Sequence, residues 1–561
     1  MKSMKVIAES AFNHNGDINY LKELALASKS AGCDYFTVQM MDVESFCTKD
    51  YSKYELYKDN EITSTEWREL FTYCKEEKIS VLPCVLEEKS LTLATEFNFK
   101  LIKIHATDIN NVPLLKEIAK TKDVKVILET QCATSIELEL SIKILGNKIE
   151  ALFSGYSNYP SEVEELNLNV LDTFKSKYPY KIGFADHTLD VANIPLMLLA
   201  KNCDYIEKHI TLTRNNRNFD WQVSLYPEEM TIMVQNIKHY TKALGKGIKH
   251  PSTHEKSFRS IMYKKVIPNS DNLKRSDSGE FYIENLINSF SQNNTVAAVI
   301  ARLKSQRLKE KVLLPFVENE MIIDLFKSIS RSNKFKSILA TSDLKEDEKL
   351  ISLFDTYKFP SFKGDAVSVI DRLLQLALNE KASSIFRVTG DNPFTDYKLM
   401  ELMIEQMNEF NLDYVKVNGV PFGVGCELIS TKYLWKLYLD LKTTEFSEYL
   451  TWYILLDKTV KIGSIDVKTN ANLHLVNLSV DIKEDYDRCQ DLISKAKFKK
   501  ITDIDLKSLL NNLSNFDKID DSKFIKLPEG NKIKLSKYLS DFENKNYTVR
   551  WEYDIEKESK N

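Results

Sequence analysis

Eight short apolar runs, each of strand length, recur through the first 210 residues of this chain. They are "KVIAESAF" (5–12), "YFTVQM" (35–40), "SVLPCVL" (80–86), "LIKIHA" (101–106), "VKVILET" (124–130), "ALFSGYS" (151–157), "KIGFADH" (181–187) and "DYIEKHI" (204–210). A stretch with the spacing of an amphipathic helix follows each run. This alternation indicates parallel strands joined by crossover helices, and eight repeats are the number that closes a (β/α)₈ barrel. A doubly wound open sheet is the competing interpretation.

Polar side chains gather where these runs end. In "VIAESAFNHNG" (6–16), Glu9 and Asn13 follow an apolar run directly. The same position in later runs holds Gln39, Lys103, Asp108, Asp186, His187, Lys208 and His209. Barrels of this kind carry their chemistry at the C-terminal ends of the strands. These residues are therefore the candidate site.

His187 and His209 end consecutive expected strands. Neighbouring strands lie about 4.8 Å apart, so the two imidazoles can share one divalent ion, and Asp220 adds a carboxylate on the next loop. Lys103 and Lys208 offer positive charge to a phosphate or a carboxylate. The alternatives without a functional role are two unrelated surface histidines and solvated lysines at the rim.

The pattern breaks from about 250 to 293 into polar, turn-rich segments, which we interpret as a connector. A second α/β unit then begins, with expected strands at 295–302, 337–343, 383–391 and 413–419. Too few strands remain for another barrel, so we expect a Rossmann-like, three-layer α/β sheet. The expected domains are 1–250, a linker at 251–293, 294–510, and a charged, partly helical C-terminal extension at 511–561.

A basic loop follows the first strand of this second unit. "IARLKSQRLKEK" (300–311) carries Arg302, Arg307 and Lys311, where an open α/β sheet would grip a nucleotide triphosphate. Asp391 and Asp481 follow later expected strands and suit a magnesium ion that bridges phosphates. The alternatives are a charged helix start and ordinary turn aspartates.

Composition excludes several classes of function. The net charge of -4 gives no support to a nucleic-acid partner. No apolar stretch approaches the roughly 20 residues of a membrane span, and the first residues do not resemble a signal peptide. Eight scattered cysteines suit a reducing cytoplasm, so we expect a cytoplasmic protein. The sequence does not fix the oligomeric state, and a homodimer remains open.

Four segments together resemble the sialic acid synthase family of nonulosonate synthases over residues 4 to about 245. These are "IAESAFNHNGD", "LIKIHATDINNVPLL", "FADHTLD" and "IEKHITLTRNNRNFD". The resemblance implies a TIM barrel that condenses phosphoenolpyruvate with an N-acylated aldose (a hexose such as N-acetylmannosamine) and forms an α-keto acid sugar.

The resemblance also implies roles for single residues. His187 and His209 would hold a divalent metal, typically Mn²⁺, that polarises the sugar aldehyde. Glu9 would handle the sugar and water, and Lys103 would bind phosphoenolpyruvate. Asp186 is counted with these catalytic residues. The expected substrate-binding residues are Asn13, Gln39, Asp108, Lys208 and Asp220.

The sequence departs from that family on the phosphoenolpyruvate side. Thr37 stands where a lysine is expected, Ala106 opens an "ATD" in place of a serine-glycine loop, and Glu129 replaces a serine. "PCV" (83–85) replaces an "STP" motif. The family's C-terminal antifreeze-like domain has no recognisable match. The pocket is therefore expected to be altered.

The second unit resembles the nucleotide-sugar cytidylyltransferases of the SpsF-like and CMP-sugar synthetase branch, from about 295 to 490. An "ARxxSxRLxxK" pattern spans Ala301 to Lys311, "TxDxP" begins at Thr389, and "VDxxED" begins at Val480. Lys309 and Glu310 replace the usual proline and glycine before that lysine. The resemblance implies CTP as substrate, with Mg²⁺ on Asp391 and Asp481. Arg302, Arg307 and Lys311 would neutralise the triphosphate, and Glu427 would lie on the sugar side.

The two resemblances describe consecutive steps. We therefore expect a bifunctional transferase that makes an α-keto acid sugar and activates it with CTP to a CMP-sugar. The alternative is a cytidylyltransferase fused to a barrel that uses another donor or serves as a silent sugar-binding scaffold.

Overall fold

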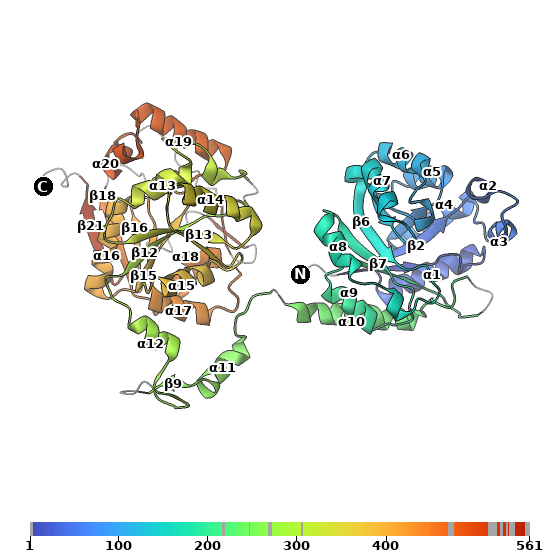
Figure 1. Ribbon diagram of the computed structural model, residues 1–561, viewed down its shortest axis with the longest axis horizontal. Helices are drawn as coiled ribbons and strands as arrows, with labels where there is room; N and C mark the ends of the chain where they lie inside the picture. Colours follow the sequence, from blue (N-terminus) through green and yellow to red (C-terminus); the bar gives the residue numbers. More distant parts are fainter. Residues whose placement is uncertain are drawn as a thin grey trace. The chain divides into compact units, whose positions relative to one another are not determined.

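The computed structural model describes residues 4–215, 219–245, 247–267, 272–304, 307–445, 447–468, 476–513, 524–527, 531–534, 537 and 545–555. Ser305 of the basic loop lies outside these residues. The chain forms two compact units, Met1–Gly247 and Ile248–Asn561 (Figure 1).

The first unit is a closed barrel of eight parallel strands in chain order (Figure 1). The strands are β1 (Lys5–Glu9), β2 (Tyr35–Met40), β3 (Val81–Val85), β4 (Leu101–Ile104), β5 (Lys125–Glu129), β6 (Ile149–Gly155), β7 (Lys181–Ala185) and β8 (Tyr205–His209). β8 pairs with β1 along its whole length, from Tyr205 opposite Lys5 to His209 opposite Glu9. The expected (β/α)₈ barrel is confirmed, and the open sheet is wrong.

Helices surround the strands of the barrel (Figure 1). They are α1 (Ile18–Ala31), α2 (Val43–Phe46), α3 (Tyr54–Asp59), α4 (Ser64–Glu76), α5 (Glu88–Glu96), α6 (Val112–Lys120), α7 (Ser135–Leu145), α8 (Val170–Lys177), α9 (Asn193–Ala200) and α10 (Pro227–Thr241). Local signals set their ends, as in α4, where Thr63 and Glu66 form a reciprocal capping box. α1 likewise begins after the Asp17 cap and ends at Gly32 in the left-handed conformation.

The barrel interior is apolar toward the N-terminal ends of the strands. Ile7, Leu82, Ile127, Phe153 and Tyr205 belong to one buried cluster there. Strand side chains alternate between faces, so two residues further along several of these strands the next inward positions lie at the C-terminal end. There the chain places Glu9, Cys84, Glu129 and Glu207. The apolar layer thus forms the floor of a polar site.

The second unit begins with a small module. It contains α11 (Thr253–Met262), a three-stranded sheet of β9 (Lys265–Val266), β10 (Leu273–Lys274) and β11 (Glu280–Phe281), and α12 (Tyr282–Asn288). The segment expected as a plain connector therefore carries regular structure. His250 and Lys256 donate to the carbonyl of Leu441, which attaches the module to the second unit.

The main body of this unit is an eight-stranded sheet in the order β14-β13-β12-β15-β17-β16-β18-β21. Its strands are β12 (Thr295–Ile300), β13 (Lys336–Ser342), β14 (Ser361–Gly364), β15 (Ser384–Thr389), β16 (Tyr414–Asn418), β17 (Glu427–Ser430), β18 (Ile462–Lys468) and β21 (Val549–Asp554). β17 pairs antiparallel to its neighbours, and every other pairing is parallel. A separate two-stranded sheet joins β19 (Phe524–Lys526) to β20 (Lys532–Lys534).

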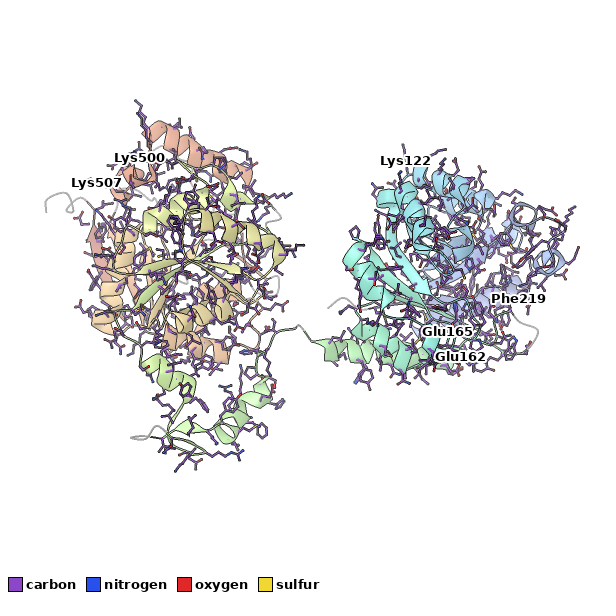
Figure 2. The ribbon with its side chains drawn as sticks, viewed as in Figure 1. Lys122, Glu162, Glu165, Phe219, Lys500 and Lys507 are labelled. Carbon is purple, nitrogen blue, oxygen red and sulfur yellow. The ribbon has the colours of Figure 1, made fainter. Side chains whose placement is uncertain are left out.

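Helices cover both faces of the sheet, which gives the expected three layers (Figure 1). α13 (Met321–Ile329), α14 (Glu348–Thr356), α16 (Tyr397–Phe410), α19 (Lys483–Ala496) and α20 (Leu506–Asn511) contribute to the core on one face. α15 (Val369–Asn379), α17 (Thr431–Asp440) and α18 (Leu450–Leu456) contribute to the core on the other. Lys500 and Lys507 lie on the outer side of this unit, near α19 and α20 (Figure 2). Within the described residues, no helix is both long and apolar enough to cross a membrane.

The sequence predicted only part of this sheet. The sequence pattern indicated four of its strands and missed β14, β17, β18 and β21. The expectation of a partly helical C-terminal tail is wrong for 549–554, which form the edge strand β21. Val549, Trp551 and Tyr553 pack against the core below the sheet, so alternation is present there but is masked by the charged residues between them.

Candidate active sites

Lys103 lies at the centre of the polar end of the barrel and is fully buried among three carboxylates. Its Nζ lies 3.0 Å from Glu9 Oε1, 3.1 Å from Glu129 Oε1 and 2.9 Å from Glu207 Oε1. The ammonium donates hydrogen bonds to Glu9 and Glu207, and Glu129 adds a third ion pair. Burial alone would lower the pKa of Lys103, but the carboxylates hold it well above its ordinary value. The lysine is therefore a permanent cation.

The three carboxylates differ in their protonation. Burial and the neighbouring Glu9 raise the pKa of Glu207 well above its ordinary value. The pKa of Glu9 is lowered despite burial, because Lys103 and His209 favour its charged form. Lys103 likewise lowers the pKa of Glu129 against the effect of burial. A proton on Glu207 thus relieves one of the two surplus negative charges of the cluster.

His187 and His209 lie side by side at the ends of β7 and β8, with ring centroids 5.2 Å apart. Burial lowers the pKa of His209 to about 3 and also lowers that of His187, so both rings are neutral near pH 7. The backbone carbonyl of Tyr156 binds His187 Nδ1. His209 Nδ1 is buried without a hydrogen-bond partner and lies 3.8 Å from Asp220 Oδ2. Neutral imidazoles and a nearby carboxylate are a donor set that fits a divalent metal.

A second possible ligand group overlaps this site. Among the described residues, one group of at least three ligand side chains has its atoms within 4.8 Å of one another, namely Glu9, Glu129 and Glu207. Lys103 already neutralises these carboxylates, so an ion there would compete with the ammonium. The histidine pair is therefore the better candidate for a resident metal.

Two other predicted residues support this site. Gln39 Nε2 donates to Glu9 Oε1 at 2.9 Å. Asn13 Nδ2 donates to the carbonyl of Phe219 at 2.9 Å, which connects the loop after β1 to the loop after β8. Phe219 lies at the edge of the barrel, beside its N-terminal elements (Figure 2). Asp220, the next residue, has its pKa raised to about 6 by burial and by Glu9.

The structure does not bring the remaining predicted barrel residues to this cluster. Lys208 lies opposite Ala8 in the strand register, and Ala8 faces the helices. The side chain of Lys208 therefore points outward from the barrel, on the outer face of β8. There its Nζ lies 2.9 Å from Asp186 Oδ2, and both side chains are buried. Asp108 accepts from Asn111 and Thr107 within its own turn. These three residues have side-chain partners outside the Lys103 cluster, and their expected site roles stay predictions.

Sequence reasoning missed Glu207 and Tyr159. Glu207 precedes His209 by two residues on the same strand, so strict alternation would have placed it beside the histidine. The ring of Tyr159 lies 4.6 Å from that of His187 and 5.9 Å from that of His209, centroid to centroid. Tyr159 comes from the loop after β6, and no pattern in the sequence indicates it.

The unusual residues of the barrel have definite partners. Thr37 is buried, and its hydroxyl donates to the carbonyl of Leu82, so it does not replace a lysine in function. Glu129 is bound at both oxygens: Oε1 contacts Lys103, and Oε2 accepts from the backbone N–H of Ala106 at 3.2 Å. A carboxylate of the chain thus holds one backbone donor and one cation at this end of the barrel.

In the second unit, Lys311 brings two aspartates together. Its Nζ lies 2.6 Å from Asp391 Oδ2 and 2.8 Å from Asp481 Oδ1. Arg307 Nη2 also contacts Asp481, at 3.1 Å. The two carboxylates converge on Lys311 although they lie 90 residues apart, so a Mg²⁺ bound by both would have to displace the ammonium from between them. Arg302 is elsewhere: its guanidinium donates to the carbonyl of Ala366.

Glu427 lies on β17 and is held by three neighbours. Arg387 Nη1 lies 2.6 Å from its Oε2, Tyr414 donates to its Oε1 at 2.6 Å, and the hydroxyl of Thr451 donates to the same oxygen. These partners lower the pKa of Glu427 although its burial would raise it, and Arg387 contributes most. The carboxylate is therefore ionised and fixed in position.

Comparison with known proteins decides the family. The NeuB family model matches residues 24–249, and a cytidylyltransferase family model matches residues 296–512. The chain belongs to the NeuB family in its first unit and to the cytidylyltransferases in its second. Both expected resemblances are confirmed, and a synthase-family barrel joined to a cytidylyltransferase domain supports a bifunctional transferase.

Individual relatives match one half or the other. An uncharacterised protein of Methanocaldococcus jannaschii is 35% identical over 48% of this chain and 81% of its own length. The N,N'-diacetyllegionaminic acid synthase of Campylobacter jejuni is 29% identical over 56% of this chain and 99% of its own. The spore coat polysaccharide biosynthesis protein SpsF of Bacillus subtilis is 28% identical over 36% of this chain and 88% of its own. A crystal structure of N-acetylneuraminic acid synthetase from Leptospira borgpetersenii is 27% identical, covers 46% of this chain and 92% of its own, and has a TM-score of 0.43.

Proposed function

We propose that the chain makes and activates a nonulosonate. The barrel condenses phosphoenolpyruvate with an N-acylated hexose to an α-keto acid sugar, and the second unit joins that sugar to CMP from CTP. The observation that carries the proposal is that a NeuB family model and a cytidylyltransferase family model match consecutive parts of one chain. The eight scattered cysteines suit a reducing compartment, so we place the protein in the cytoplasm.

In the barrel, His187 and His209 would hold a divalent ion such as Mn²⁺. That ion would polarise the aldehyde of the sugar. Glu9 lies between this pair and Lys103, with Oε2 3.6 Å from His209 Nε2 and Oε1 3.0 Å from Lys103 Nζ. An ionised carboxylate there can orient the sugar and accept a proton from the attacking water. Gln39 and Lys103 hold that carboxylate in place.

In the second unit, Asp391 and Asp481 would hold Mg²⁺, which neutralises the triphosphate when bound. Lys311 and Arg307 contact the same carboxylates and supply positive charge at the site where pyrophosphate leaves. Arg302 could join them only by leaving Ala366. The sugar hydroxyl attacks the α-phosphate, the bond to the β-phosphate breaks, and pyrophosphate is released.

One observation favours a second candidate function for the barrel. Glu129, a carboxylate of the chain itself, pairs with Lys103 and accepts from the backbone N–H of Ala106. A barrel whose cation and N–H group are already bound in this way can use a substrate other than phosphoenolpyruvate, or serve as a silent scaffold for the transferase.

Product analysis tests both candidates. The pure protein is incubated with phosphoenolpyruvate, CTP and a panel of N-acylated hexoses, and products are identified by mass spectrometry. We expect a free α-keto acid sugar without CTP and its CMP conjugate with CTP. A CMP-sugar formed only when the acid sugar is supplied ready-made would support the silent or altered barrel instead.

A further inference from the structure

The second unit has a cavity of about 470 Å³ at one face of its sheet. Thr389 and Asn392, which flank Asp391 in the sequence, lie in its wall, so the cavity adjoins the proposed Mg²⁺ site. Its lining also includes the glycine-containing loop that follows β16. Gly419 and Gly423 have φ of 79° and 92°, and a Cβ on either would lie within 2.5 Å of backbone atoms. The loop therefore packs closely against the backbone of other segments of the same unit, at Val467 and Ser479, and forms a fixed wall.

A row of charged side chains crosses the sheet beneath this cavity. The strand registers place Arg387 opposite Glu427 and Glu427 opposite Lys416. They continue from Lys416 to Ser464 and from Ser464 to Arg550. Residues paired across neighbouring strands point to the same face of a sheet. Five adjacent strands therefore present one polar row, and Arg387, Lys416, Glu427 and Arg550 line the cavity.

The far end of this row belongs to the C-terminal segment of the chain. Tyr547 and Arg550 line the cavity, yet they lie beyond residue 512, where the cytidylyltransferase family match ends. The guanidinium of Arg550 stacks 4.1 Å from the centroid of the Tyr547 ring, and its Nη1 lies 3.4 Å from Asp466 Oδ2. The backbone of the segment is fixed by Thr548, which donates to the carbonyl of Ile462 at 2.8 Å. The segment is thus a built part of the cavity wall.

The charges in the lining favour an anion. Three cations, Arg387, Lys416 and Arg550, face two carboxylates, Glu427 and Asp466. Arg387 pairs with Glu427 at 2.6 Å and Arg550 pairs with Asp466 at the longer distance of 3.4 Å, so the lining keeps one surplus positive charge, on the side of Lys416 and Arg550. Hydroxyl and amide side chains of threonine, tyrosine and asparagine make up much of the remaining polar lining and can bind sugar hydroxyls.

We propose that β21 completes the acceptor pocket of the transferase, and that Arg550 with Lys416 recognises the carboxylate of a polyhydroxylated sugar acid. The inference rests on the proposed function, since it names the residues that select the acid sugar over neutral sugars. It adds a specificity-determining residue that lies outside the family-matched segment.

The test compares Arg550→Gln and Arg550→Lys with the unchanged full-length protein. Release of pyrophosphate from CTP is measured with N-acetylneuraminate and N,N'-diacetyllegionaminate supplied directly, and binding of each acid is measured by calorimetry. Arg550→Gln removes the charged partner of the acid's carboxylate. Loss of one hydrogen bond between charged groups should raise KM for the acid about tenfold to a hundredfold, while KM for CTP should change by less than about twofold. Arg550→Lys should restore most of the affinity. The preference of the unchanged protein for an acid over its carboxamide should disappear in Arg550→Gln.

Glu552→Gln is the matched control. Glu552 lies two residues further along β21, where its carboxylate pairs with Lys468 at 2.6 Å and both side chains are exposed. This variant should leave KM for the acid unchanged.

The outcomes separate the inference from the proposed function. A lower melting temperature in Arg550→Gln with unchanged KM for the acid would show that Arg550 only stabilises the edge strand β21, and would overturn the inference. Failure of the unchanged protein to bind either acid would overturn it as well. Binding that weakens in Arg550→Gln, without turnover in any variant, would support the inference and reject the proposed function.

Discussion

Replacing Glu129 tests how the barrel handles its donor. We expect Glu129→Ser to improve the use of phosphoenolpyruvate, and the addition of Thr37→Lys to improve it further. In the unchanged protein, Lys103 Nζ donates hydrogen bonds to Glu9 and Glu207 and forms an ion pair with Glu129 at 3.1 Å, so its charge is already balanced by carboxylates of the chain. Removing Glu129 frees one side of Lys103 from its ion pair, releases the backbone N–H of Ala106, and removes one negative charge from the pocket.

The magnitude follows from the released contacts. A hydrogen bond to a charged group is worth about 1.5–3 kcal/mol, so one new bond from Lys103 to phosphoenolpyruvate should lower KM about tenfold to a hundredfold. Loss of the buried Glu129–Lys103 contact works against stability, so the melting temperature should fall. Improved substrate use together with reduced stability is the combination expected if Glu129 acts as an internal substitute for a substrate anion.

The assay follows release of inorganic phosphate at varied phosphoenolpyruvate with a fixed N-acylated hexose. Glu150→Ser is the matched control, because Glu150 also pairs with a lysine, Lys181, but lies near the start of β6. Saturation of the unchanged protein at micromolar phosphoenolpyruvate would refute the reasoning. If no variant consumes phosphoenolpyruvate with any sugar, the donor assignment itself is wrong.

Three further predictions concern the other sites. His187→Ala with His209→Ala should remove one equivalent of manganese from the full-length protein and abolish condensation, which elemental analysis and product formation would detect; retained metal would exclude this pair as its ligands. Arg307→Ala and Asp391→Ala should each lower CTP-dependent turnover by about 3–4 kcal/mol in activation free energy, a factor of about 10²–10³, and leave keto-sugar formation unchanged. Parallel loss of both activities would contradict independent sites. Gly183→Ala should destabilise the barrel by about 1–3 kcal/mol in chemical denaturation, because a Cβ there would lie 2.1 Å from a buried phenylalanine ring, and an unchanged midpoint would contradict this packing.

Strand alternation predicted the barrel and the neighbouring positions of His187 and His209, because both depend on local sequence and on a fixed topology. It did not predict the environment of Lys103. Its three carboxylate partners come from β1, β5 and β8, and only the assembled barrel brings these strands around one nitrogen. Lys208 lies away from this cluster for a simpler reason: it is adjacent to His209 on β8, so its side chain points to the opposite face of the strand.

The second sheet was harder to predict because sequence order and spatial order differ. β17 inserts antiparallel between β15 and β16, and β21 joins the edge from more than 80 residues beyond β18. The basic loop and the two aspartates were nevertheless recognisable, since each directly follows a strand or motif. What the sequence could not show was that Lys311 binds both aspartates while Arg302 turns away to Ala366.

The pairing of β1 with β8 has a consequence for synthesis of the protein. Glu9 lies opposite His209, a residue that leaves the ribosome 200 positions later. At about 5–20 residues per second, β1 waits roughly 10–40 s with one edge unpaired before its partner is made. The charged centre of the barrel therefore cannot assemble until β8 has been made, and the nascent chain has to keep an apolar strand from pairing with other chains during that interval. A chaperone that binds extended apolar segments would have its longest opportunity at residues 5–9.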